Sequence, residues 1–217
     1  MIRSASWLLA LLGVVGPVTA RQTVADLPPP PEWRMGSFEL EVWNSPAFKR
    51  RFVESYLSET EVEPRVTTVE RETMQQIMEF LSDDRMDKAL ELLQKNRTDA
   101  SSAVFDFTVG NIHFQREDLD EAAKAYEVAV AKHPKFLRAW RNLALIRVRR
   151  EDYTGALDGF ARVVEMGGAD GLVYGLMGYC YSTLENHLSA ESSYRMAILL
   201  DPQTMDWKLG IARSLFK

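Results

Sequence analysis

The chain has 217 residues, of which 46% are hydrophobic and 26% are charged, a composition typical of a folded protein rather than of a disordered tail. Its formal net charge of −5 argues against nucleic acid as a partner, because a phosphate backbone favours a basic surface. The single cysteine, Cys180, cannot form an internal disulfide, so packing must hold the fold together.

Residues 1–20 have the order of a secretory signal. Arg3 gives a basic start, residues 7–15 are a short apolar stretch, and small residues precede the end at Ala20. We therefore expect export to the periplasm or cell envelope, with cleavage after Ala20. An uncleaved membrane anchor is the alternative, although so short a stretch does not comfortably cross a hydrocarbon core of ~30 Å.

Residues 21–44 are predicted to form a Pro-rich spacer, because the prolines of "LPPPPEW" at 27–33 keep the backbone stiff and extended. The alternation in "FELEVW" at 38–43 is a weak strand signal. Residues 45–69 are predicted to hold an amphipathic helix and a connector, with Ser45 as the cap and Pro46 in the first turn.

From about Thr67 the pattern is helical throughout. Thr67 and Glu70 fit a capping box, in which each side chain bonds the other residue's backbone N–H. Residues 70–102 are predicted to form a degenerate helical hairpin, with Ile77 on the apolar face of its first helix and Ala89 and Leu93 on that of its second.

An internal repeat with a spacing of 34 residues follows. Full units are predicted at 103–136, 137–170 and 171–204, and a partial repeat or capping helix at 205–217. The recurring anchors are small residues where the two helices of a unit cross, aromatic residues four positions after the second small residue, and prolines that end the second helix. They are Gly110, Ala122, Tyr126, Pro134, Ala144, Ala156, Phe160, Gly178, Ala190, Tyr194 and Pro202, and Trp140 in the first helix of the middle unit is a further anchor.

The segment "AWRNLALIRVRREDYTGAL", with Trp140, Ala144, Tyr153 and Ala156 at characteristic spacing, resembles the tetratricopeptide repeat (TPR) family over about residues 70–217. The resemblance implies an all-α solenoid of helical hairpins, a TPR-like right-handed superhelix, whose first helices line a concave groove for peptides or partner helices. An unrelated helical bundle is the alternative. In the middle unit, Gly168 is expected to end the second helix in place of proline.

The predicted groove residues come from the first helices of the three units. They are Val104, Phe107, Asn111, Phe114, Arg138, Arg141, Leu145, Arg149, Leu172, Tyr179 and Thr183. Arg138, Arg141 and Arg149 share one stripe with Leu145, and the planar guanidinium group suits carboxylates, so the ligand expected is an acidic segment or a chain terminus. The alternative is a solvated face whose arginines pair with local acids.

No enzyme is indicated, and no metal or cofactor is expected. The three histidines lack metal-ligand spacing, and no glycine-rich phosphate loop follows a strand. Cys180 is interpreted as a buried small residue. The expected function is therefore a non-catalytic interaction scaffold or adaptor that binds protein or peptide and meets a membrane only through an uncleaved signal. The alternative is the N-terminal interaction region of a larger enzyme that continues beyond Lys217.

Overall fold

The computed structural model describes residues 62–215, and in that range the chain consists of helices and their connections, without a β-strand. The helices follow the predicted spacing, because the first helices of successive units begin at Ala103, Leu137, Gly171 and Met205. In chain order they are α3 (Thr68–Ser82), α4 (Met86–Asn96), α5 (Ala103–Gln115), α6 (Leu119–Lys132), α7 (Leu137–Arg149), α8 (Tyr153–Glu165), α9 (Gly171–Thr183), α10 (His187–Leu200) and α11 (Met205–Leu215).

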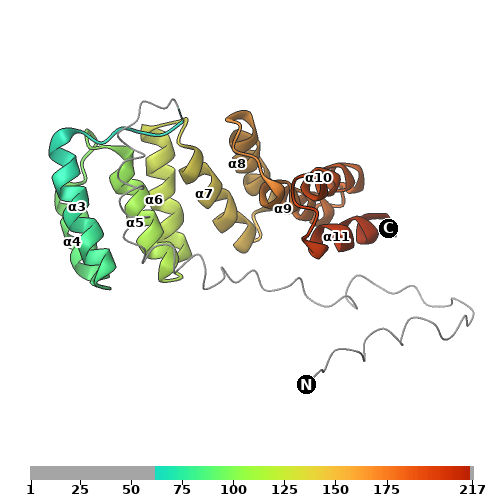
Figure 1. Ribbon diagram of the computed structural model, residues 1–217, viewed down its shortest axis with the longest axis horizontal. Coiled ribbons are helices and arrows are strands. Elements are labelled where there is room, and N and C mark those ends of the chain that lie inside the picture. The colour runs from blue at the N-terminus through green and yellow to red at the C-terminus, as the bar shows by residue number, and fades with distance from the viewer. Residues whose placement is uncertain (1–61, 216–217) are drawn as a thin grey trace, which may run out of the picture.

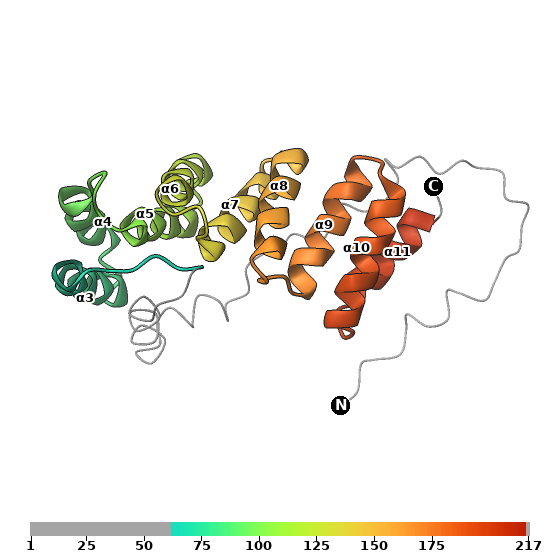
Figure 2. The same cartoon turned by 90° about the horizontal axis from the view of Figure 1, so that it is seen from above.

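Consecutive helices pair into hairpins that stack along one axis. The pairs are α3 with α4, α5 with α6, α7 with α8 and α9 with α10, and α11 packs on α9 and α10. In Figures 1 and 2, α3 and α11 stand at opposite ends of the stack. The described residues therefore form an open all-α solenoid of helical hairpins, which confirms the predicted fold class over a closed bundle.

The apolar interior runs the length of the stack as three clusters. The first extends from Val66 through α3–α6 to one side of α7, the second joins α7, α8 and α9, and the third joins α9, α10 and α11. Trp140 packs against the first and second clusters, and Leu172 packs against the second and third. Each hairpin thus buries apolar residues between its own two helices and also against its neighbours, as expected for repeats that are not separate domains.

The small and aromatic repeat anchors at the helix crossings are buried, whereas Pro134 and Pro202 are exposed, and the crossings are packed in a way that the sequence did not predict. We expected the glycine of the first helix to face the alanine of the second, whereas a Cβ built on Gly110 would lie 2.5 Å from Cε1 of Tyr126. Likewise, a Cβ on Gly178 would lie 2.7 Å from Cδ1 of Tyr194, and a Cβ on Gly210 of the next unit 2.4 Å from Cζ of the same ring. The glycines therefore make room for the aromatic ring, and Tyr194 packs between its own unit and the next.

The helix ends follow the predicted capping signals in most places. Thr67 and Glu70 form the expected capping box at the start of α3. Helices α6 and α10 end two residues before Pro134 and Pro202. In the middle unit the prediction for Gly168 was wrong, because Gly167 has the left-handed backbone (φ 76°) that follows the end of α8.

The turns inside the hairpins repeat one backbone conformation, and an arginine beside two of these turns forms an ion pair with the preceding unit. Asp84, Glu117, Glu151 and Glu185 all have positive φ values, between 57° and 63°. Arg116 at the end of α5 pairs with Asp87 of the preceding unit (Nη2–Oδ1 2.7 Å), and Arg150 at the end of α7 pairs with Asp120 (3.2 Å). One repeat further on, these two positions hold Leu184 and Thr154, so this polar link stops before the last hairpin.

The predicted signal at 1–20, the spacer at 21–44 and the helix that begins near Ser45 lie outside the described residues. Within 62–215, every helix is too short or too polar to cross a membrane.

Candidate partner-binding groove

The structure spreads the predicted groove residues over a range of burial. On α5, Val104 and Phe107 are buried, with exposed fractions of 0% and 3%. Leu145 and Tyr179 are half-buried, and Arg149 is exposed. Phe107 lies against the rings of Tyr126 and Phe136, at centroid distances of 5.6 and 4.8 Å. The accessible part of the predicted groove is thus on α7 and α9 rather than on the first half of α5.

An irregular segment before α3 lies across the N-terminal ends of α5 and α7. We call residues 62–66 the strap, and Figures 1 and 2 show it running from α3 toward α7. The Ser102 hydroxyl donates a hydrogen bond to the carbonyl of Arg65 (2.7 Å), and the N–H of Leu137 donates to the carbonyl of Val62 (3.2 Å). Pro64 of the strap is buried. The Val62 carbonyl therefore satisfies one of the free N–H groups at the start of α7, whose N-cap residue makes no side-chain cap.

The strap places a carboxylate on the first arginine of the predicted stripe. Glu63 accepts two hydrogen bonds from Arg138, from Nε to Oε1 at 3.0 Å and from Nη2 to Oε2 at 2.9 Å. The Glu63 side chain is 14% exposed and that of Arg138 is 30% exposed. The Arg138 guanidinium also lies over the ring of Phe107, 5.8 Å from its centroid. This two-bond geometry is the one in which arginine recognises carboxylates most specifically.

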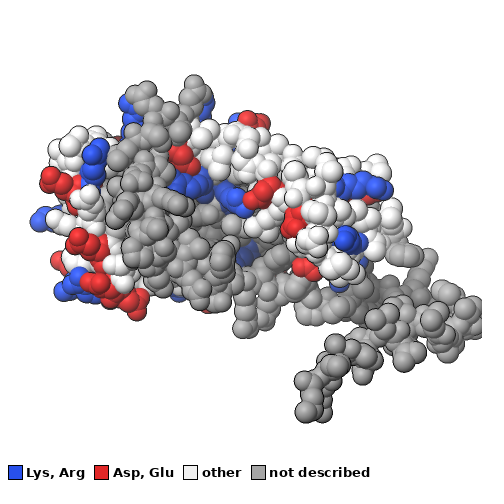
Figure 3. All heavy atoms as spheres, viewed as in Figure 1, with Lys and Arg blue, Asp and Glu red and all other residues white. Residues whose placement is uncertain are grey.

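The other two arginines of the stripe also have partners in the chain. Arg141 pairs with Asp170, with 2.6 Å between Nη2 and Oδ2, while the second oxygen of Asp170 accepts the N–H of Val173 and caps α9. The guanidinium of Arg149 lies 5.3 Å from the ring centroid of Phe114. Figure 3 shows basic and acidic side chains interspersed on the face drawn there. The alternative of pairing with local acids thus holds for Arg138 and Arg141.

Asn111 and Asn142 belong to a polar network between two units. The Tyr126 hydroxyl donates to Oδ1 of Asn111 (2.6 Å), and Nδ2 of Asn142 donates to the same oxygen and to the Tyr126 hydroxyl (3.1 Å each). Burial raises the pKa of Tyr126, so its hydroxyl keeps its proton. The network gives the buried tyrosine its hydrogen-bond partners and links α5, α6 and α7.

A buried acid that the sequence reasoning missed lies on α5. Asp106 is fully buried, and its two oxygens lie 3.2 Å from Nε of Arg97 and 2.7 Å from Nζ of Lys132. A lone aspartate within the apolar stretch "AVFDFTVG" was the available signal, because a buried carboxylate requires charged partners. We interpret this cluster as a structural link between α5, α6 and the connection before α5.

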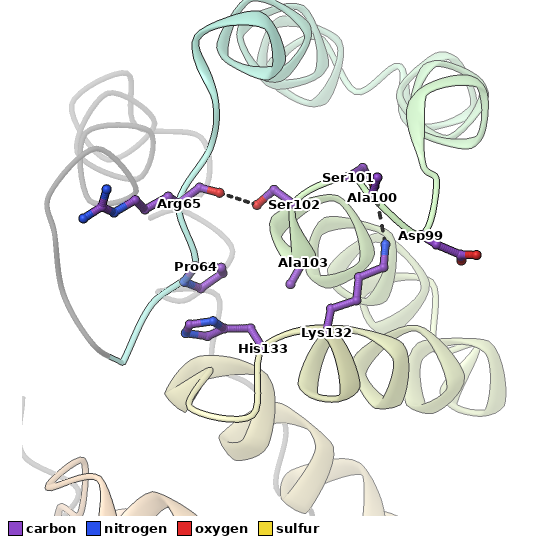
Figure 4. A pocket seen from close by; sticks show the side chains of 9 residues that line it. All are labelled: Pro64, Arg65, Asp99, Ala100, Ser101, Ser102, Ala103, Lys132 and His133. Carbon is purple, nitrogen blue, oxygen red and sulfur yellow. Dashed lines mark hydrogen bonds between the residues drawn. The ribbon is translucent and has the colours of Figure 1, made fainter.

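Beside this cluster is an open pocket of about 340 Å³, bounded by the strap, the α4–α5 connection and the end of α6 (Figure 4). Lys132 reaches into it but donates to the carbonyl of Thr98 (2.6 Å) as well as pairing with Asp106. The lining residues are Pro64, Arg65, Asp99, Ala100, Ser101, Ser102, Ala103, Lys132 and His133. None of the predicted groove residues is among them, so the pocket and the groove are separate features.

Cys180 is fully buried, and burial raises the pKa of its thiol to about 12. A thiol with that pKa is almost entirely protonated at neutral pH and is therefore a poor nucleophile. His113 contacts Asp118, with 3.4 Å between Nδ1 and Oδ2. Among residues 62–215, histidine, cysteine, aspartate and glutamate form no group of three that could hold a metal ion.

Stacked hairpins, glycine–aromatic crossings and the 34-residue spacing define a helical-repeat protein of the solenoid class. Models of the tetratricopeptide repeat family match residues 107–170 and 172–204 of the chain. Such repeats are typically interaction modules, so the coarse functional class is a protein-interaction scaffold.

Two curated proteins are similar to part of the chain. The general transcriptional corepressor trfA of Dictyostelium discoideum is 29% identical over 87 residues, which are 40% of this chain and 6% of that protein. The general transcriptional corepressor ssn6 of Schizosaccharomyces pombe is 28% identical over 105 residues, which are 48% of this chain and 10% of that protein. The chain thus spans a tenth or less of the length of these relatives.

Solved structures of MamA show the same fold. The MamA fragment from Desulfovibrio magneticus RS-1 that begins at its residue 41 is 16% identical with a TM-score of 0.61, and the match covers 70% of this chain and 86% of that one. MamA from AMB-1 is 20% identical with a TM-score of 0.59, and the match covers 65% of this chain and 78% of that one. At these identities the likeness concerns the fold.

Proposed function

We propose that this protein is a non-catalytic scaffold whose groove binds an extended, acid-bearing segment of a partner protein. One observation carries the proposal: Arg138 already holds a carboxylate, that of Glu63, through two hydrogen bonds of 3.0 and 2.9 Å. This surface can therefore accommodate an irregular peptide segment and fix its acidic side chain.

The rest of the stripe extends the same chemistry along α7. Arg141 and Arg149 follow Arg138 by three and eleven residues, so the three side chains lie on the same side of the helix. Leu145 lies between them, and Tyr179 of α9 is half-buried beside the same cluster. An acidic partner that also carries apolar side chains would match this combination, exchanging the ion pair of Arg141 with Asp170 for a pair across the interface.

We further propose that the protein acts after export, in the periplasm or elsewhere in the cell envelope. The support is the order of residues 1–20, with a basic start, an apolar stretch and small residues before Ala20. Sequencing the N-terminus of the protein from its native cell tests this proposal. A mature chain that begins at Arg21 agrees with it, and an intact Met1 in the cytoplasmic fraction contradicts cleavage and export.

The groove is tested with a fluorescein-labelled peptide of alternating glutamate and leucine, titrated with the full chain at two salt concentrations. The double variant Arg141→Glu with Arg149→Glu is expected to bind the peptide at least about tenfold more weakly, because both charges then repel the ligand. Glu63→Gln is expected to bind it more tightly, because the competing carboxylate on Arg138 is gone.

The matched control is Arg162→Glu, a charge reversal on α8 with a side chain that is 61% exposed. It changes the net charge in the same direction but lies outside the predicted groove, so it is expected to bind the peptide nearly as the wild type does. Equal losses in Arg162→Glu and in the groove variants would show a general charge effect and would contradict the groove. Unchanged peptide binding in all variants would also contradict the groove.

A further inference from the structure

The outer face of α10 carries an exposed apolar stripe. Leu188 is 81% exposed, Leu199 is 73% exposed and Met196 is 39% exposed. On a helix with 3.6 residues per turn, Leu188, Ser192, Arg195 and Leu199 fall within a sector of about 60°, with Met196 on one flank. Exposed apolar side chains grouped on one face indicate a surface that another molecule covers.

The equivalent faces of the preceding units lack the two exposed leucines of α10. At the four repeat positions that α10 fills with Leu188, Ser192, Met196 and Leu199, helix α8 has Thr154, Asp158, Arg162 and Glu165. Helix α6 has Asp120, Lys124, Val128 and Ala131 there. The fold therefore does not require apolar residues at these positions. What sets α10 apart is the pair of leucines, Leu188 and Leu199, each more than 70% exposed, where α6 has Asp120 and Ala131 and α8 has Thr154 and Glu165.

We propose that two copies of this chain associate through α10, with the two helices antiparallel about a twofold axis. In such a pair, residues whose numbers add up to 387 face one another, so Leu188 of each copy meets Leu199 of the other. Ser192 then faces Arg195 near the axis, where the small serine lets the helices approach. This reciprocal pairing of one patch with itself is the geometry of an isologous interface.

The charges on α10 suit this arrangement. Within one copy, Arg195 pairs with Glu191, with 2.6 Å between Nη2 and Oε1, and the arginine side chain is 65% exposed. A twofold axis perpendicular to the helices keeps each flank beside the same flank of the other copy. Glu191 of one copy then lies next to Arg195 of the second copy, and the reverse holds. The pair gains two reciprocal opposite-charge contacts on one flank, while uncharged Ser192 and Met196 lie toward the other.

One helix pair buries less surface than the 1,200–2,000 Å² that is roughly typical of stable complexes. The dimer is therefore expected to be weak and reversible, with a dissociation constant on the order of micromolar. Sedimentation velocity of the full chain over a roughly hundredfold concentration range around that value is expected to show a monomer–dimer equilibrium. A wild-type chain that stays monomeric throughout would overturn the proposal.

Single variants locate the interface. Leu199→Asp is expected to weaken self-association at least about tenfold, because it places two carboxylates in the apolar ends of the pair. Leu209→Asp, at a leucine on α11 that is 50% exposed, is the matched control and is expected to associate like the wild type. If Leu209→Asp dissociates the dimer while Leu199→Asp does not, α10 is not the interface.

Charge exchange tests the antiparallel register itself. Glu191→Arg alone and Arg195→Glu alone each create like-charge contacts across the axis, so each variant is expected to dimerise more weakly than the wild type. Mixed in equal amounts, they are expected to form heterodimers in preference to either homodimer, because both contacts are then of opposite charge. Random mixing, measured by native mass spectrometry, would overturn this register. Circular dichroism of each variant verifies that it is folded.

Discussion

At the residue scale, the turns between the two helices of each hairpin hold an acidic residue where the backbone favours glycine. Asp84, Glu117, Glu151 and Glu185 adopt left-handed conformations, which cost a residue with a Cβ roughly 1 kcal/mol relative to glycine. No sequence signal reveals this conformation, because the usual marker is glycine or asparagine itself.

The left-handed conformation of these residues predicts that a change to glycine stabilises the protein. Glu185→Gly, at φ 60°, is expected to stabilise the protein by up to about 1 kcal/mol, because glycine adopts this backbone conformation without strain. The greater conformational entropy of glycine in the unfolded chain offsets part of this gain. Glu72→Gly, at an exposed position inside α3, is expected to destabilise it by about 1 kcal/mol. Chemical denaturation measures the free energy of unfolding of both variants. A change in the same direction for both would contradict the interpretation.

The sequence reveals the repeat anchors because they recur in register, and it hides features that occur once. Tyr126 and Tyr194 are buried as their spacing predicted. Asp106 was missed because a charged residue on a helix is expected to face water. Its burial depends on Arg97 and Lys132, which come from other elements.

At the scale of elements, the start of α3 is tied to the start of α5 through one carboxylate. Oε2 of Glu70 accepts the N–H of Thr67 (2.9 Å) in the capping box, and Oε1 accepts the N–H of Ser102 (2.7 Å). Burial by itself would raise the pKa of Glu70, but the hydrogen bonds from Ser102 and Thr67 outweigh it, and the net pKa lies below 4.5. The charged form is thus favoured in the folded state.

Glu70→Gln is therefore expected to lower the free energy of unfolding by about 1 kcal/mol at pH 7. A folded-state pKa below that of the unfolded chain gives stability that is complete above pH 4.5 and is lost as the pH falls through the folded-state value. The difference between wild type and variant should accordingly shrink in acid. Urea unfolding at pH 7 and below pH 4 measures it, with the exposed Glu72→Gln as control. A difference independent of pH would contradict the role of the charge.

The strap shows why the groove could be predicted only in part. The spacing places Arg138, Arg141 and Arg149 on one side of α7, but Glu63 lies 75 residues from Arg138 in the sequence. No local pattern pairs two residues so far apart. Similarly, Phe107 shares the predicted stripe of α5, yet the rings of Tyr126 and Phe136 bury it.

At the scale of the whole molecule, the stack of hairpins makes stability a property of neighbouring units. Ile77→Ala removes a fully buried side chain from the first cluster and is expected to cost roughly 2–5 kcal/mol in that region. Hydrogen exchange is expected to quicken in α3 and α4 and to change little in α9–α11. Trp207→Ala, in the third cluster, should give the opposite distribution. Equal acceleration in all helices for both variants would show a single cooperative unit instead.

Trp140 and Leu172 each pack against two neighbouring clusters, so they mark the places where one part of the apolar interior meets the next. Trp140 is further fixed by a hydrogen bond from Nε1 to the carbonyl of Pro134 (2.8 Å). At the two places where Trp140 and Leu172 connect neighbouring apolar clusters, the stack is expected to bend more readily than within a hairpin. Arg138 lies on α7, the helix of Trp140, and Tyr179 lies on α9, the helix of Leu172. A slight change in the curvature of the stack would therefore alter the distance between Arg138 and Tyr179. The predicted groove could in this way adjust to the length of a bound peptide.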